Sequence, residues 1–166
     1  AGPARLARKM VYGRLAPGEE NSGRLVSLVR EKAKQIAKEN NYDVILYDGP
    51  PGIGCPVIST ITGIDKAVLV TEPTLSGKHD LERALETVFH FRIYAMVVIN
   101  KFDLNTEMTE EIKKYCQMLN VPVVALLPYY PAVTNAMVSG KSVVEYETDS
   151  DFRKLISTIW KNIQSE

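Results

Sequence analysis

The stretch from Asp43 to Pro56 constrains the fold of this chain more than any other. A short apolar run, Val44–Tyr47, ends abruptly in Asp48 and is followed by a loop built almost entirely of glycine and proline. A near-continuous apolar run of this kind predicts a strand buried on both faces of a parallel sheet. Nucleotide-hydrolysing α/β proteins use a carboxylate at the end of such a strand to hold magnesium, and the following loop to sense a terminal phosphate. The stretch therefore predicts part of a nucleotide-binding site.

Further apolar runs alternate with segments of helical periodicity along the chain. The expected strands, besides Val44–Tyr47, are Ala67–Thr71, Met96–Asn100 and Val121–Leu127. The expected helices are Arg24–Glu39, His79–His90, Thr106–Leu119, Val133–Val138 and Asp151–Ile163. This alternation predicts an α/β fold with a doubly wound, mostly parallel sheet flanked by helices. We expect a single, partial nucleotide-binding domain over residues 1–166, with an irregular N-terminal segment at 1–22 and an α/β core at 23–166.

Composition and charge exclude several classes of protein. Lys and Arg together number 20, as do Asp and Glu, so no net charge points to a nucleic acid or an anionic membrane as partner. No apolar run approaches the roughly 20 residues of a membrane span. The apolar face of the last expected helix, which includes Phe152 and Trp160, is better explained by packing on the core than by membrane binding. Two separate cysteines suit a reducing cytoplasm, which is the expected location.

Asp48 and Gly52 are the expected catalytic positions. Asp48 would hold a water on a magnesium ion that bridges the outer phosphates, and would thereby be a metal ligand through water. Gly52 could bring its N–H against a γ-phosphate, where a side chain would block the approach. The alternative is that Asp48 caps the next turn and that Gly52 is an ordinary turn glycine.

The tetrapeptide Asn100-Lys101-Phe102-Asp103 follows an expected strand and is a candidate for base recognition. Read literally it is the Asn-Lys-x-Asp that recognises guanine in GTP-binding proteins, whereas related ATPases use an Asn at this strand end for adenine. The alternative is a helix-entry loop in which Asp103 or Asn105 caps the helix. After the fourth run, Pro128 and a tyrosine ring could form a wall for the base, or simply a connection between strand and helix.

The phosphate loop that normally accompanies these elements is absent from the sequence. No Gly-x-x-x-x-Gly-Lys-Ser/Thr occurs in the 166 residues, in the ordinary or the lysine-doubled form. We therefore expect the chain to be the C-terminal portion of a longer polypeptide and to be inactive as an ATPase by itself. The missing first strand would leave unpaired backbone groups beside the strand that ends at Asp48.

Segments in a fixed order over nearly the whole chain carry a family resemblance. They are Gly18–Val26, Asp48–Val57, Val70–Arg83, Val98–Asn105 and Gly140–Tyr146. In these segments the chain resembles the MinD/ParA/Mrp group of deviant P-loop ATPases (the SIMIBI type), most closely the MinD-superfamily ATPases that carry an inserted ferredoxin-like domain. The resemblance implies ATP as ligand, a magnesium ion and a dimer that sandwiches two nucleotides.

The same resemblance assigns roles to individual residues. It makes Asp48 the Walker B carboxylate and Gly52 part of switch II, and it places Asn100 on the adenine and Pro128 in the base wall. Asp103 and Tyr130 are the further expected nucleotide contacts. Cys55 follows Asp48 at the spacing of an iron–sulfur ligand in the nitrogenase iron protein, a distant relative; the alternative is a small buried thiol beside the switch loop.

For the intact protein we expect an ATP-hydrolysing switch coupled to iron–sulfur or redox cargo, with an iron–sulfur cluster in an N-terminal insert and an iron–sulfur or redox protein as partner. A non-catalytic interaction module that keeps the fold without nucleotide is one alternative. A GTP-dependent metallochaperone-type protein, which rests on Asn100-Lys-Phe-Asp103, is another.

Overall fold

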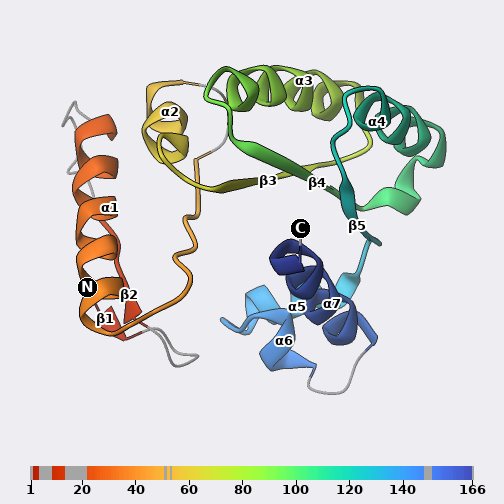
Figure 1. Ribbon diagram of the computed structural model, residues 1–166. Coiled ribbons are helices and arrows are strands. Elements are labelled where there is room, and N and C mark those ends of the chain that lie inside the picture. The colour runs from red at the N-terminus through yellow and green to blue at the C-terminus, as the bar shows by residue number, and fades with distance from the viewer. Residues whose placement is uncertain are drawn as a thin grey trace. The chain divides into compact units, whose positions relative to one another are not determined.

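The structure is a computed structural model, and it describes residues 2–3, 9–13, 22–50, 52, 54–147 and 151–165. Contacts along the chain divide it into two compact units, Ala1–Ile64 and Asp65–Glu166 (Figure 1). Each unit is described by itself, and the expected single domain over residues 1–166 stays a prediction.

The described residues of the first unit include a pair of short antiparallel strands and two helices. Strand β1 (Gly2–Pro3) pairs antiparallel with β2 (Lys9–Met10), and helices α1 (Ser22–Glu39) and α2 (Cys55–Ile61) follow. The expectation of a wholly irregular segment at 1–22 is therefore wrong where the structure describes it. Strands of two residues are too short to show the period of two by which a strand is recognised in sequence.

Arg30 joins α1 to the end of α2. Its side chain is buried, and its guanidinium donates to the backbone carbonyls of Ser59 and of Thr62. The last carbonyls of a helix lack partners within the helix and carry partial negative charge, so a buried cation satisfies both needs. The guanidinium carbon also lies 5.0 Å from the centre of the Tyr47 ring, which anchors the segment that leads to Asp48.

The strand expected at Val44–Tyr47 is wrong, because residues 44–50 have no regular secondary structure. Val44 is 50% exposed and Leu46 is 81% exposed. A strand exists only when a neighbouring strand accepts its hydrogen bonds, and the pairings in the described residues include none with this segment. Its apolar residues indicate a preference for burial, but they do not specify a partner.

The second unit is built on a parallel sheet of three strands in the order β3-β4-β5. Its elements, in chain order, are β3 (Lys66–Thr71), α3 (Leu75–His90), β4 (Tyr94–Asn100), a 3₁₀ turn η1 (Phe102–Leu104), α4 (Thr106–Met118), β5 (Val123–Leu127), α5 (Pro131–Val138), α6 (Val143–Tyr146) and α7 (Asp151–Ser165). Lys66 pairs with Tyr94 and Thr71 with Ile99, while Asn100 pairs with Leu127. The register therefore brings the carboxyl ends of the strands to one edge.

Strand β4 is the centre of the core of this unit. All of its residues from Ala95 to Ile99 are buried. Helices α3 and α4 lie on one face of the sheet, joined by an ion pair of 2.9 Å between Lys78 and Glu111, and α7 lies on the other (Figure 1). The largest fully buried side chains are Leu85, Met96, Ile99, Ile112, Val88, Val97 and Cys116. Burial raises the pKa of the Cys116 thiol to about 11, so it stays protonated and packs as a small apolar group.

The parallel sheet flanked by helices confirms the expected fold class. The strands expected at 67–71 and 96–100 are confirmed, and the one expected at 121–127 begins at Val123. Helix α3 begins four residues before the expected His79, because Thr74 accepts a 2.9 Å hydrogen bond from Gly77 N and caps it. Helices α2 and α6 were not expected; their short lengths of 7 and 4 residues give too few turns for a periodic signal.

Helix α7 packs on the core, as its apolar face predicts. Phe152 and Ile159 are buried, while Trp160 is 39% exposed. The helix is tied to the sheet by hydrogen bonds from Asn162 Nδ2 to the carbonyl of Val124 (3.1 Å) and from Lys66 Nζ to the carbonyl of Ile163 (3.1 Å). No helix in the part of the chain that the structure describes is long and apolar enough to cross a membrane.

Candidate functional site

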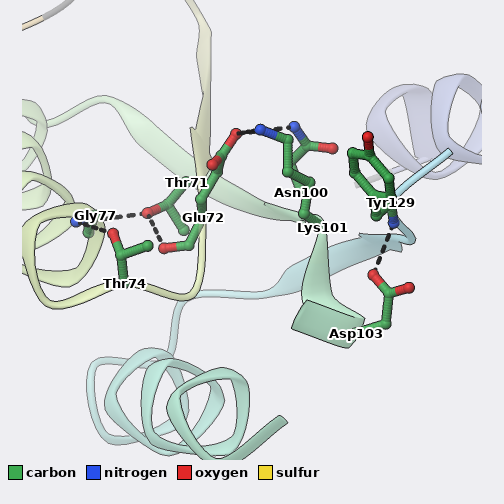
Figure 2. Close-up of polar contacts among 8 residues, drawn as sticks. All are labelled: Thr71, Glu72, Thr74, Gly77, Asn100, Lys101, Asp103 and Tyr129. Atoms are coloured by element: carbon green, nitrogen blue, oxygen red, sulfur yellow. Dashed lines mark hydrogen bonds and ion pairs between the residues drawn. The ribbon is translucent and has the colours of Figure 1, made fainter. Parts of the chain in front are cut away.

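The carboxyl ends of the three parallel strands meet at one edge of the sheet, and the expected base-recognition residues follow two of these ends. Glu72 comes directly after β3, Asn100 ends β4, and Pro128 comes directly after β5. Ligands of open α/β sheets bind outside this edge. The structure therefore brings Asn100, Asp103 and Pro128 to one edge of the sheet. Glu72 and Tyr129 lie there with Asn100 and Asp103 (Figure 2).

The Glu72 carboxylate connects the ends of β3 and β4. Its Oε1 lies 2.8 Å from Lys101 Nζ and accepts a longer hydrogen bond, 3.4 Å, from Asn100 Nδ2 (Figure 2). Lys101 lies in the left-handed region with φ 55°, so the chain turns sharply after Asn100. The Lys101 and Glu72 side chains are 36% and 43% exposed, so solvent screens the pair and its contribution to stability is at most about 1 kcal/mol. The value of the contact lies in the orientation that it gives to Asn100.

Asp103 connects the loop after β4 to the loop after β5. Its Oδ1 accepts a 2.7 Å hydrogen bond from the backbone N–H of Tyr129 (Figure 2). The cap of α4 is Asn105, whose side chain accepts a 3.0 Å hydrogen bond from Met108 N. Of the two alternatives for a helix cap, Asn105 is therefore confirmed, and Asp103 instead holds the Pro128–Tyr130 segment beside the end of β4.

The start of α3 is packed tightly against the end of β3. Thr71 Oγ1 donates to the carbonyl of Gly77 at 2.9 Å, and Gly77 N donates to Thr74 Oγ1 at 2.9 Å (Figure 2). A Cβ at position 77 would lie 2.3 Å from the backbone oxygen of Glu72. Only glycine fits there, and this close approach sets the position of the Glu72 backbone.

The two tyrosines after β5 differ in their surroundings. The Tyr130 ring is stacked on Phe152 of α7, with centroids 4.5 Å apart and planes 4° apart, and its hydroxyl donates to Glu147. One face of Tyr130 is thus covered by protein, and its expected contact with a nucleotide stays a prediction. Tyr129 is 49% exposed and offers the more accessible ring, although sequence reasoning did not single it out. Pro128 is half-buried beside it.

The remaining expected site residues belong to the first unit. Asp48 is exposed and forms no hydrogen bond or ion pair within the described residues. Gly52 has φ 91°, a conformation that favours glycine, and a Cβ there would meet no atom within 4 Å. Cys55 is the first residue of α2, and its side chain lies outside the described part of the structure, so its expected role stays untested.

A free carboxylate on a glycine-rich loop fits magnesium better than it fits a transition metal. Mg²⁺ is held in proteins by one or two carboxylates, with waters and substrate phosphates filling the other positions. The single carboxylate of Asp48 suits such a site. No group of three His, Cys, Asp or Glu residues that could hold a metal occurs in the described residues, and Cys116 is fully buried.

Comparisons with known proteins place these observations in a family. The family model described as "ParA: NUBPL iron-transfer P-loop NTPase" matches residues 23–164. The chain is 36% identical over 96 residues to the uncharacterised protein MJ0578 of Methanocaldococcus jannaschii, covering 58% of this chain and 33% of the relative. It is 27% identical over 133 residues to the sporulation initiation inhibitor protein Soj of Bacillus subtilis, covering 74% and 52%.

A solved structure has the same fold. It is the septum site-determining protein MinD of Pyrococcus horikoshii complexed with Mg-ADP, which aligns with a TM-score of 0.68 at 21% identity and covers 85% of this chain and 56% of that one. The chain thus spans between a third and rather more than half of the length of the proteins it resembles.

The tight contact at Gly77 leads to a prediction. In Gly77→Ala the new Cβ would overlap the Glu72 backbone oxygen, and the end of β3 must shift because a backbone atom cannot rotate away. We expect a loss of about 1–3 kcal/mol in the free energy of unfolding, as for overpacked sites, measured by urea denaturation. Ser76→Ala, in the same exposed helical turn, is the control and should change stability little. A Gly77→Ala protein as stable as wild type would show that this packing is not tight in solution.

Proposed function

The chain belongs to the ParA/NUBPL family of P-loop NTPases, and from this premise we propose that it is part of an ATP-binding and ATP-hydrolysing switch protein. The observation that carries the proposal is the polar edge formed by Glu72, Asn100 and Lys101 at the carboxyl ends of β3 and β4. In this proposal Asn100 recognises the base, and Pro128 forms its wall together with Tyr129 or Tyr130.

The surroundings of Asp103 favour adenine over guanine. A guanine site of the Asn-Lys-x-Asp type needs both carboxylate oxygens of the Asp to accept N–H bonds from the base. Here Oδ1 already accepts from Tyr129 N at 2.7 Å, a strong bond to a charged acceptor. Guanine would have to share Oδ1 with this contact, whereas adenine makes no demand on Asp103.

Asp48 and Gly52 are proposed to serve the phosphate end of the nucleotide. Asp48 would hold a magnesium ion through a water, and that ion would neutralise charge on the outer phosphates. The open space around Gly52 and its φ of 91° support a backbone N–H that approaches a terminal phosphate. Under this proposal the protein contributes position and fixed charge rather than covalent chemistry.

We further propose a homodimer in which two nucleotides are enclosed, with iron–sulfur or redox cargo that the ATP-dependent switch loads or releases. The cargo is supported by the description of the matching family as iron-transfer NTPases. An iron–sulfur cluster would be the cargo of the protein in this proposal. The alternative, a non-catalytic module, predicts that nucleotide changes neither dimerisation nor cargo binding.

A first test separates adenine from guanine. Asp103→Ala should leave ATP affinity within a few-fold of wild type, because the carboxylate holds a loop rather than the base. The lost hydrogen bond should lower Tm by about 2–4 °C, the shift that accompanies roughly 1 kcal/mol. Calorimetric titration of the natural full-length protein with ATP and with GTP measures the affinities. GTP binding that is tighter than ATP binding and that Asp103→Ala abolishes would contradict the adenine assignment.

A second test concerns Asp48. Asp48→Asn keeps the size of the side chain but removes the charge that orients the metal and its water. In the natural full-length protein we expect magnesium-dependent ATP hydrolysis to fall on the order of 10²-fold, as on loss of one preorganised electrostatic group. Asp43→Asn, an exposed neighbour that precedes the same segment, is the control and should hydrolyse ATP like wild type. A rate within about twofold of wild type for Asp48→Asn would exclude Asp48 as the Walker B carboxylate.

A further inference from the structure

We propose that Glu72 is a positioning residue that makes the site selective for adenine, because it fixes the direction of the Asn100 carboxamide. The inference rests on the proposed nucleotide-binding function and names a residue to which sequence reasoning gave no role. Its basis is the pair of contacts that the Glu72 carboxylate makes with Asn100 and Lys101 at the carboxyl edge of the sheet (Figure 2).

The chemistry of the three groups determines which way the carboxamide points. An ionised carboxylate only accepts hydrogen bonds, and an asparagine carboxamide has one end that donates and one that accepts. The donating Nδ2 must therefore face Glu72, as it does at 3.4 Å, and Oδ1 must face away from it. Lys101 Nζ lies 2.8 Å from the same Oε1 and holds the carboxylate in place.

The direction of Oδ1 has a consequence for the base. Adenine carries an exocyclic amino group, which donates, at the position where guanine carries a carbonyl oxygen, which accepts. An Asn100 that presents Oδ1 can accept from the adenine amino group. Against guanine the same oxygen would meet another acceptor, leaving both groups unpaired and repelling each other. An asparagine free to rotate could serve either base, so the selectivity comes from Glu72.

The Glu72→Gln substitution tests this directly. A glutamine of the same length can donate as well as accept, so the Asn100 carboxamide can rotate and present Nδ2 to the base. Competition binding with ADP and GDP on the natural full-length protein gives the ratio of the two dissociation constants. We expect wild type to favour ADP and Glu72→Gln to reduce that preference by about tenfold, mainly through tighter GDP binding.

Two further variants make the outcome unambiguous. Glu111→Gln removes a carboxylate that likewise pairs with a lysine of another element, Lys78, and should leave the preference unchanged. Glu72→Asp shortens the side chain by one methylene, so that its carboxylate no longer reaches Asn100 from a contact that is already 3.4 Å long. It should reduce the preference as Glu72→Gln does, even where Glu72→Gln folds poorly.

The inference and the proposed function fail in different ways. If wild type binds ADP with a preference over GDP and Glu72→Gln weakens both nucleotides equally, Glu72 has only a structural role and the inference is wrong. If wild type binds neither nucleotide, the proposed function is wrong and the inference falls with it.

Discussion

Strand β4 is buried from Ala95 to Ile99, and the position of the candidate site depends on that burial. Its neighbours β3 and β5 pair with it in parallel, so the carboxyl ends of the three strands lie at one edge of the sheet. The left-handed turn at Lys101 follows at once and leaves Asn100 as the last residue held by the sheet. A side chain at this position has a rigid backbone beneath it and solvent beside it, which is what precise recognition of a ligand requires.

A few polar contacts connect the segments that follow β3, β4 and β5. Glu72 reaches from β3 to Lys101 and Asn100, and Asp103 reaches from the loop after β4 to the backbone of Tyr129. These contacts lie at the protein surface, and the Glu72–Lys101 ion pair adds little to stability. Their effect is to fix directions: the carboxamide of Asn100 and the path of the chain past Pro128. We infer that Glu72, which need not touch the base, sets the direction in which the Asn100 carboxamide meets it.

Much of this arrangement could be predicted from the sequence. Continuous apolar runs identified β3, β4 and β5, and the residues after them identified Asn100, Asp103 and Pro128. The strand expected at Val44–Tyr47 could not be decided in this way, because pairing depends on a partner strand and not on the apolar character of the run. Glu72 was overlooked because a glutamate after a strand is usually solvated. The register of β3 on β4, which pairs Thr71 with Ile99, places Glu72 beside Asn100, and the left-handed turn brings Lys101 to it. A positive φ at lysine leaves no signal in the sequence.

We propose that the carboxyl edge of β3, β4 and β5 binds the base of an adenine nucleotide. Amide chemical shifts of the ¹⁵N-labelled natural full-length protein, recorded while Mg-ADP is added, test it most directly. We expect the largest changes in amide chemical shift at Asn100, Lys101 and Tyr129, with a second group of changes at Asp48 and Gly52. Mg-GDP should produce smaller changes than Mg-ADP. Unchanged amide shifts along the edge from Glu72 to Tyr129, or larger changes with Mg-GDP than with Mg-ADP, would contradict adenine binding at this edge.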